Sequence, residues 1–448
     1  MRTIISNANI VNEGKCFVGT VVIRDEFIED IIVGETIEPN ADDTIIDATG
    51  LWLLPGVIDD HVHFREPGLT HKADIESESR TAAAGGVTSY MEMPNTKPAT
   101  TNLELLEEKF QLGAEKSRVN YSFFFGASAD NSDLLPLLDP HRVPGVKLFM
   151  GSSTGNMCVG DSDAVRKVFE KSPLLIVAHC EDDAIIEQNI KQFKKKYKGQ
   201  NDFPVRYHSR IRSIEACYEA SSKAVQMAKE TGARLHIAHV SSERELDLFE
   251  QKPLEDKQIT AEACIAHLMF TTEDYDSLGT KIKCNPSVKT SEDRDALRDA
   301  LTDGKIDVVA TDHAPHLLSE KEGGALKASS GMPLIQFSLV TMLELTSEGV
   351  LPIEQVVRLM SHNPAQLYKI DRRGFIRRGY YADLVLVNPN ANWQVTSGCY
   401  YTKCGWTPME GKVFKWKVER TIVNGATAFA NGIVVDSVRG RELRYNVE

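Results

Sequence analysis

Eight short apolar runs recur along the middle of the chain, and a stretch with helical spacing separates each run from the next. The runs are residues 57–64, 87–93, 121–128, 145–150, 174–180, 234–240, 259–267 and 307–313. Their apolar residues are nearly continuous rather than alternating, as expected for strands that are buried on both faces. Eight strands that alternate with helices over about 300 residues predict an α/β fold, the (β/α)8 or TIM barrel.

The two ends of the chain differ from this pattern. Residues 1–54 and residues 373–448 contain short strand-like runs separated by turns, such as "ADLVLVNP". We therefore expect both termini to build one small β-sandwich-like domain. The barrel, residues 55–372, would be inserted between the two halves of that domain.

Charge and composition exclude several classes of function. The net charge of −13 argues against general nucleic-acid binding, because phosphate contacts require a basic surface. No apolar run reaches about 18 residues, so we expect no membrane span. The start of the chain has no signal-peptide pattern, and the eight cysteines form no C-x-x-C pair. We therefore expect a cytoplasmic protein with free thiols.

The segment "PGVIDDHVHFREPG", residues 55–68, has polar side chains at every second position. Side chains alternate between the two faces of a strand, so these side chains share one face. They are Asp59, His61, His63 and Arg65. Two imidazoles at this spacing can bind one metal ion, and the acid before them can orient one ring. Taken alone, the segment also fits a pair of hydrogen-bonded core histidines.

Potential metal ligands also end three other predicted strands. His179 and His239 lie at the ends of two runs, and Asp312 lies near the end of a third. The C-terminal ends of barrel strands meet at one mouth, where enzymes of this fold have their active sites. Imidazoles and a carboxylate from four strands therefore predict a metal site. This donor set suits a catalytic zinc with an open position better than a closed thiolate site.

Lys147 lies within the apolar run at residues 145–150. A buried lysine is costly unless it is paired or chemically altered. Desolvation lowers the pKa of a lysine, and the neutral amine can react with carbon dioxide to give a carbamate. Such a carbamate could bridge two metal ions. The alternative is a lysine that reaches past the barrel rim into solvent.

Seven successive motifs resemble those of the dihydroorotase family, in the cyclic amidohydrolase branch of the amidohydrolase superfamily. They are "PGVIDDHVHFREPG", "MEMPNT", "GVKLFMGS", "AHCED", "IAHVSS", "KCNPSVK" and "VATDHAPH", which follow in the expected order between residues 55 and 316. The resemblance covers nearly the whole chain. The resemblance implies an enzyme that reversibly cyclises N-carbamoyl-L-aspartate to L-dihydroorotate with loss of water. This reaction belongs to pyrimidine (UMP) biosynthesis.

The resemblance also implies a binuclear centre with two Zn²⁺ ions. The implied ligands are His61, His63, Lys147, His179, His239 and Asp312. The first two histidines and Asp312 would hold one zinc, the other two histidines would hold the second, and N6-carboxylated Lys147 and a hydroxide would bridge them. Asp312 would also be catalytic, because it would take the hydroxide proton and deliver it to the leaving nitrogen. Some members of the family bridge with an aspartate instead and use fewer metals.

Further residues are expected to bind the substrate. The planar fork of Arg65 suits a carboxylate, and dihydroorotate carries one on its ring. The resemblance gives Asn95 and His316 the same task, and it gives Asn285 a hydrogen bond to the ring amide. The alternatives are a salt bridge from Arg65 to Glu66 or another acid, turn formation by the asparagines and a loop position for His316.

Other features leave alternatives open. His267 reads as a strand-end histidine with a supporting role at best, and His208 as structural or solvated. Residues 317–331 are polar and Gly-rich and fit either a mobile lid or a surface loop. The competing functions are an allantoinase, a dihydropyrimidinase (hydantoinase) and a non-catalytic scaffold. We expect a homodimer, the commonest default.

Overall fold

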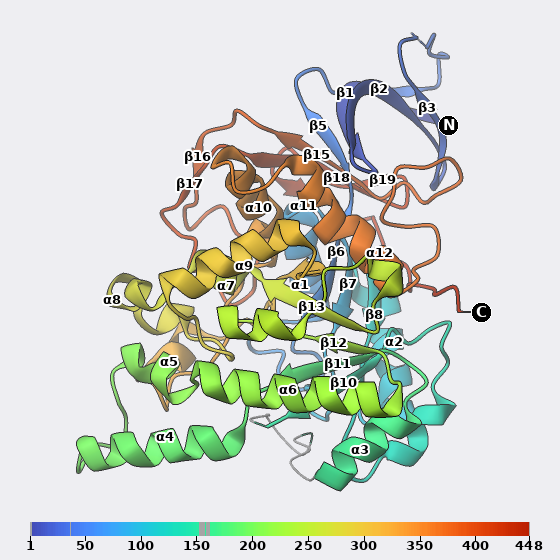
Figure 1. Cartoon of the computed structure of the whole chain (residues 1–448). Coiled ribbons are helices and arrows are strands. Elements are labelled where there is room, and N and C mark those ends of the chain that lie inside the picture. Colours follow the sequence, from blue (N-terminus) through green and yellow to red (C-terminus); the bar gives the residue numbers. More distant parts are fainter. Residues whose placement is uncertain (1, 36, 152–156, 158–161, 448) are drawn as a thin grey trace.

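Parallel strands form the centre of the computed structural model, which describes residues 2–35, 37–151, 157 and 162–447 (Figure 1). The strands are β6 (Val57–Val62), β7 (Val87–Glu92), β8 (Asn120–Phe123), β9 (Phe125–Gly126), β10 (Val146–Met150), β11 (Ile176–Cys180), β12 (Leu235–Ile237), β13 (Ile259–Cys264) and β14 (Val308–Ala310). β6 to β8 form one sheet and β9 to β14 another. Only Phe124 separates β8 from β9, so together they make one barrel strand.

The first and last barrel strands close the ring. Val62 forms a parallel bridge with His313, and the backbone N–H of His63 donates to the His313 carbonyl at 2.8 Å. Every residue of β6 and of β7 is buried, as expected for strands that are covered on both faces. A structural strand therefore lies within each of the eight runs predicted from the sequence.

Helices surround these strands in Figure 1. They are α1 (Ile75–Ala84), α2 (Leu103–Lys116), α3 (Ser162–Lys171), α4 (Asp183–Lys196), α5 (His208–Ile211), α6 (Ile214–Thr231), α7 (Ile265–Met269), α8 (Tyr275–Leu278), α9 (Ser291–Asp303), α10 (Ser338–Ser347), α11 (Ile353–Val357) and α12 (Asn363–Leu367). α6 starts after Ser213, which caps it through Ala216 N, and stops at Gly232 in the left-handed conformation. No helix within the described ranges has both the length and the apolar content needed to cross a membrane.

One predicted strand is shorter than the sequence indicated. The run at 259–267 leaves the sheet after Cys264, and α7 begins at the next residue. His267 therefore lies in a helix and not at a strand end, which corrects the prediction. Its Nε2 lies 3.0 Å from the carbonyl oxygen of Pro286.

Strands from both termini share a separate sheet. They are β1 (Arg2–Asn12), β2 (Lys15–Arg24), β3 (Phe27–Ile32), β4 (Thr44–Asp47), β5 (Trp52–Pro55), β15 (Leu384–Asn388), β18 (Lys417–Val423), β19 (Ala426–Ala430) and β20 (Ile433–Val434). The two parts join where β5 pairs with β15 (Figure 1). A small hairpin-like pair, β16 (Trp393–Gln394) and β17 (Val413–Phe414), lies apart from this sheet. The domain boundaries at residues 54 and 372 stay a prediction.

A buried carboxylate links this sheet to the barrel. Asp383 accepts hydrogen bonds from Asn120 Nδ2 of β8 at 3.0 Å and from Asn424 N at 2.8 Å. It also forms an ion pair with Arg373, and both side chains are buried. Breaking such a pair leaves an uncompensated charge in the interior.

We predict that Asp383→Asn lowers the free energy of unfolding by about 3–5 kcal/mol, because it leaves the buried Arg373 guanidinium without a counter-ion. Urea denaturation measures the change. The control is Glu187→Gln, which removes an exposed pair with Lys191 and should cause no measurable change. Equal unfolding midpoints for Asp383→Asn and the wild type would contradict this role.

Candidate metal centre

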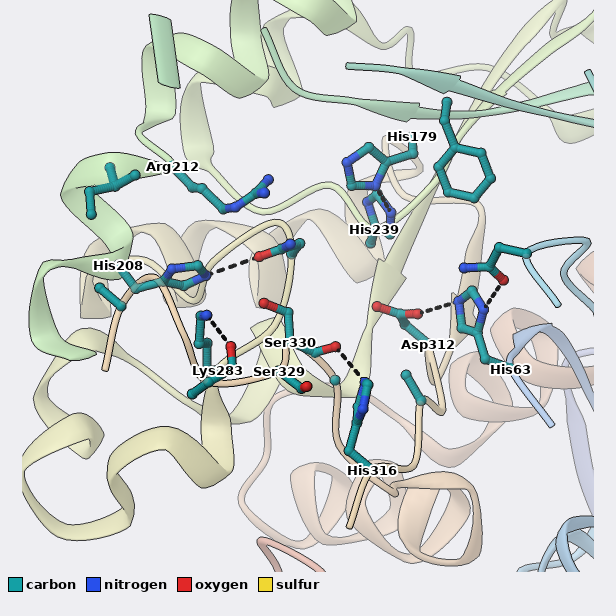
Figure 2. A pocket seen from close by; sticks show the side chains of 18 of the residues that line it. His63, His179, His208, Arg212, His239, Lys283, Asp312, His316, Ser329 and Ser330 are labelled. Atoms are coloured by element: carbon teal, nitrogen blue, oxygen red, sulfur yellow. Dashed lines mark hydrogen bonds and ion pairs between the residues drawn. The ribbon is translucent and has the colours of Figure 1, made fainter. Parts of the chain in front are cut away.

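A cavity of about 490 Å³ opens at the C-terminal ends of the barrel strands, and Figure 2 shows side chains that line it. All the site residues predicted from the sequence are among its lining residues. They are His61, His63, Arg65, Asn95, Lys147, His179, His239, Asn285, Asp312 and His316. The fold thus gathers side chains that are up to about 250 positions apart in the chain. Their individual roles stay predictions.

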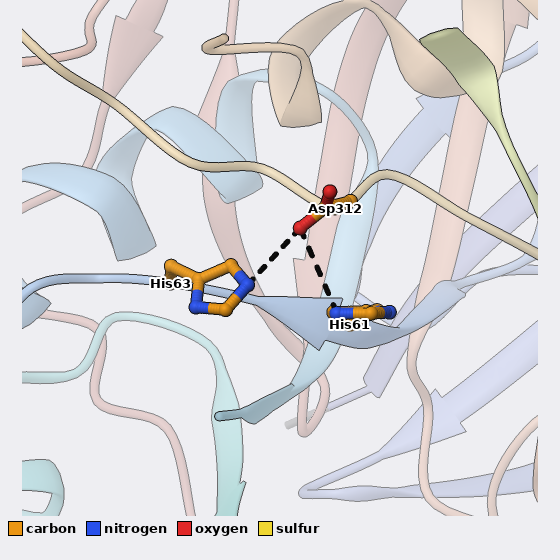
Figure 3. Close-up of side chains that lie close together, drawn as sticks. All are labelled: His61, His63 and Asp312. Atoms are coloured by element: carbon orange, nitrogen blue, oxygen red, sulfur yellow. Dashed lines mark hydrogen bonds and ion pairs between the residues drawn. The ribbon is translucent and has the colours of Figure 1, made fainter. Parts of the chain in front are cut away.

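One group of possible ligands consists of His61, His63 and Asp312 (Figure 3). The Nε2 atoms of the two histidines face Asp312 Oδ1, at 3.6 Å and 3.0 Å respectively. Asp312 has a positive φ of 47°, a strained conformation for a residue other than glycine. In this backbone conformation the carboxylate lies beside the two imidazoles, just beyond the end of β14.

The remaining nitrogens of these two rings have fixed partners. His61 Nδ1 lies 2.9 Å from Glu262 Oε1, and His63 Nδ1 lies 2.7 Å from Asn95 Oδ1. Glu262 accepts the Nδ1 proton of His61, which leaves the lone pair of that ring on Nε2. His63 has an oxygen partner at each ring nitrogen, because its Nε2 also lies 3.0 Å from Asp312 Oδ1. The prediction that Asp59 orients a ring is wrong, because its Oδ1 accepts the backbone N–H of His61 at 3.3 Å. The sequence analysis missed Glu262. It lies in the apolar run at residues 259–267, and a charged residue inside such a run is the same signal that revealed Lys147.

A second group lies at the ends of β11 and β12. His179 Nδ1 is 2.9 Å from His239 Nε2, and His179 Nε2 is 3.1 Å from Glu181 Oε2. Burial opposes ionisation of Glu181, but Arg212 and His179 outweigh it and hold its pKa at about 2. Burial lowers the pKa values of His179 and His239. It also lowers the pKa of His63, in the first group, to about 4. Neutral imidazoles are the form that binds metal ions.

Lys147 lines the same cavity, is fully buried and interacts electrostatically with His179, His239 and Asp312. Its Nζ has no hydrogen-bond partner among the residues that the structure describes and lies 5.3 Å from the centroid of the Phe149 ring. Burial lowers the pKa of Lys147. The alternative of a lysine that extends into solvent is therefore wrong. A buried amine without a partner, beside four imidazoles and a carboxylate, fits a metal centre with a carboxylated lysine.

Arg65 and Lys72 both contact His316 beside the first group, and Lys72 also pairs with Glu320 at 2.8 Å. Arg65 Nε donates to the Pro315 carbonyl at 3.0 Å, and its Nη2 lies 3.1 Å from His316 Nε2. Lys72 Nζ lies 3.0 Å from the other nitrogen of His316, and burial with these two charges lowers the pKa of His316. The alternative partner of Arg65, Glu66, pairs with Lys116 instead. The sequence had no spacing signal for Lys72.

The opposite side of the cavity contains His208, which Figure 2 shows with Lys283 nearby. His208 is buried, and its Nε2 lies 3.0 Å from Asn285 Oδ1. Burial lowers the pKa of His208 to about 3. The reading of His208 as a solvated residue is therefore wrong, and its fixed contact orients the Asn285 amide instead.

The loop at residues 317–331 contributes another wall. Its last seven residues line the cavity. Lys321 fastens the loop, because its Nζ donates to the carbonyls of Lys283, Ser329 and Gly331 at 3.0, 2.7 and 2.7 Å. The segment is thus part of the cavity and not only a surface loop, and motion as a lid stays a prediction.

The family profile described as "Amidohydrolase family" matches residues 52–428. The chain belongs to the amidohydrolase family. This amidohydrolase is 34% identical over 440 residues to a dihydroorotase of Halobacterium salinarum, covering 94% of this chain and 99% of the relative. It is 28% identical over 435 residues to an allantoinase of Bacillus velezensis, covering 96% and 94%. An L-hydantoinase structure from Arthrobacter aurescens matches with a TM-score of 0.91, 27% identity and 97% coverage of each chain.

These likenesses confirm the predicted fold class and the predicted type of enzyme. The protein is a cyclic amide hydrolase with a barrel and a β-rich part. Because its relatives include enzymes for different rings, the family alone does not select the substrate.

We predict that Lys147→Met stabilises the metal-free protein by about 0.5–2 kcal/mol, because an apolar side chain of similar length replaces a buried, unpaired amine. Thermal unfolding of both proteins with a chelator present measures the difference. The same variant should also retain less metal than the wild type. A less stable metal-free Lys147→Met protein would show that the amine has a compensating partner.

Proposed function

We propose that this amidohydrolase is a dihydroorotase, which interconverts N-carbamoyl-L-aspartate and L-dihydroorotate in pyrimidine biosynthesis. The single observation that carries the proposal is the position of Arg65 on the cavity wall, beside His316 and Lys72. Dihydroorotate has a ring carboxylate, and a guanidinium binds carboxylates through two parallel hydrogen bonds. The relatives named dihydroorotase support the same choice.

The six predicted ligands would hold two zinc ions. They are His61, His63, Lys147, His179, His239 and Asp312. Lys147, carboxylated on its amine, would be a ligand of both ions, as its buried amine without a hydrogen-bond partner suggests. When bound, the zinc ions polarise the ring carbonyl and lower the pKa of a water molecule toward 7.

The side chains of the cavity then have separate roles in substrate binding and proton transfer. Arg65, Asn95 and His316 bind the substrate carboxylate, and Asn285 donates to the ring. Asp312 takes a proton from the water that attacks the ring carbonyl, and it delivers that proton to the ring nitrogen as the C–N bond breaks. In the reverse direction the carbamoyl nitrogen attacks the side-chain carboxyl carbon of carbamoyl aspartate, and one water molecule leaves.

The alternatives make different demands on the same cavity. Allantoin and dihydrouracil lack a ring carboxylate, so an enzyme for either would have no use for the buried Arg65 fork in the cavity. A scaffold without activity would need neither the metal ligands nor the residues that orient them. Assays on the three rings, together with the zinc content, distinguish these possibilities.

We predict that the purified protein, supplied with zinc and bicarbonate, hydrolyses L-dihydroorotate in preference to dihydrouracil and allantoin. Arg65→Met should lower kcat/KM for dihydroorotate by about 100-fold, because a charge-assisted contact contributes roughly 2–4 kcal/mol. It should also reduce the preference for dihydroorotate over dihydrouracil.

The matched control is Arg206→Met, which removes an exposed arginine outside the cavity lining and should leave kcat/KM unchanged. Turnover of dihydrouracil or allantoin instead of dihydroorotate would contradict the proposal. Failure to hydrolyse any of the three rings, with no zinc bound, would favour a scaffold.

A further inference from the structure

The histidines around the cavity use opposite ring nitrogens. In His61 and His63, Nδ1 is hydrogen-bonded to a neighbouring side chain and Nε2 faces Asp312. In His179 the arrangement is reversed, because Nε2 contacts Glu181 Oε2 at 3.1 Å. His179 therefore carries its proton on the opposite nitrogen to His61, whose Nδ1 donates to the Glu262 carboxylate at 2.9 Å.

Glu181 decides where that proton lies. A neutral imidazole has one N–H and one lone pair, and a carboxylate can only accept a hydrogen bond. Contact with Glu181 therefore places the proton on Nε2 and leaves the lone pair on Nδ1. That Nδ1 lies 2.9 Å from His239 Nε2, so the two nitrogens face one point from the ends of two strands.

Arg212 keeps Glu181 in place. Its guanidinium donates to the same Oε2 atom that contacts His179, and it lines the cavity. Figure 2 shows the Arg212 side chain extending toward His179. Its own backbone is fixed, because the Arg212 carbonyl accepts a hydrogen bond from Ser287 Oγ at 2.9 Å. Glu181 is fully buried, so its charge needs this partner.

We propose that Glu181 and Arg212 are positioning residues that keep the proton of His179 on Nε2, so that Nδ1 binds the metal ion shared with His239. The inference rests on the proposed metal centre and not on the identity of the substrate. Partners of this kind fix the orientation of a ligand and raise its basicity, and their loss lowers metal affinity by about 10–100-fold.

Asp182, the neighbouring acid, provides a matched comparison. Its carboxylate accepts the backbone N–H of Ile185 at 3.1 Å, which caps α4, and it pairs with Lys223 at 2.9 Å. Asp182 thus stabilises a helix end on the surface, whereas Glu181 contacts a ligand. The two acids allow a structural role to be separated from a positioning role within one motif.

The test is zinc binding, measured by elemental analysis after dialysis against a series of chelator concentrations. Glu181→Gln replaces the carboxylate with an amide that can donate as well as accept, so it no longer selects one tautomer. We expect this variant to release its more weakly held zinc at a chelator concentration about 10–100-fold lower than the wild type does. Arg212→Met should act in the same direction, and it serves as the second variant if Glu181→Gln does not fold.

A double-mutant cycle with His179→Ala tests whether Glu181 affects zinc binding through His179. If Glu181 acts through His179, adding Glu181→Gln to His179→Ala should cause no further loss of zinc. Asp182→Ala, which removes the helix cap as well as the ion pair, should lower the thermal midpoint while leaving zinc retention unchanged.

Zinc retention equal to the wild type in Glu181→Gln and Arg212→Met would overturn the proposal. So would a further loss of zinc when Glu181→Gln is added to His179→Ala. Zinc is measured without substrate, so either result is independent of which ring the enzyme hydrolyses.

Discussion

A buried amine without a hydrogen-bond partner among the described residues is the constraint on which the rest of the site depends. Lys147 lies on β10, lines the same cavity as the four histidines and is fully shielded from water. A protein interior accepts such a group only if its charge is removed or compensated. Carboxylation would do more than remove the charge, because it would create an anionic ligand in the same cavity as the four histidines.

The surrounding shell makes the imidazoles usable as ligands. Burial keeps the pKa values of His63, His179 and His239 below their usual range, so these rings stay neutral. Glu262 and Glu181 then select which nitrogen of a neighbouring ring carries its proton. The barrel brings the strand ends together, and these acids orient the imidazole rings. Both contributions are needed to build the site.

The barrel strands and the cavity residues could be predicted from the sequence because they follow a simple rule. A buried parallel strand reads as an apolar run, and a polar residue at its end has few purposes other than the active site. The supporting residues follow no such rule. Arg212 and Lys72 reach the site from segments outside the strands, and only the folded chain brings them to Glu181 and His316. The end of β13 at Cys264 was missed because the helix that follows is also apolar.

The most direct test of the central claim is a ¹³C NMR spectrum of protein loaded with zinc and ¹³C-labelled bicarbonate, combined with elemental analysis. We predict a carbamate carbon signal that is absent from Lys147→Met, together with two zinc ions per chain. A protein with full dihydroorotate turnover but no carbamate signal would contradict the assignment of Lys147 as the bridging ligand.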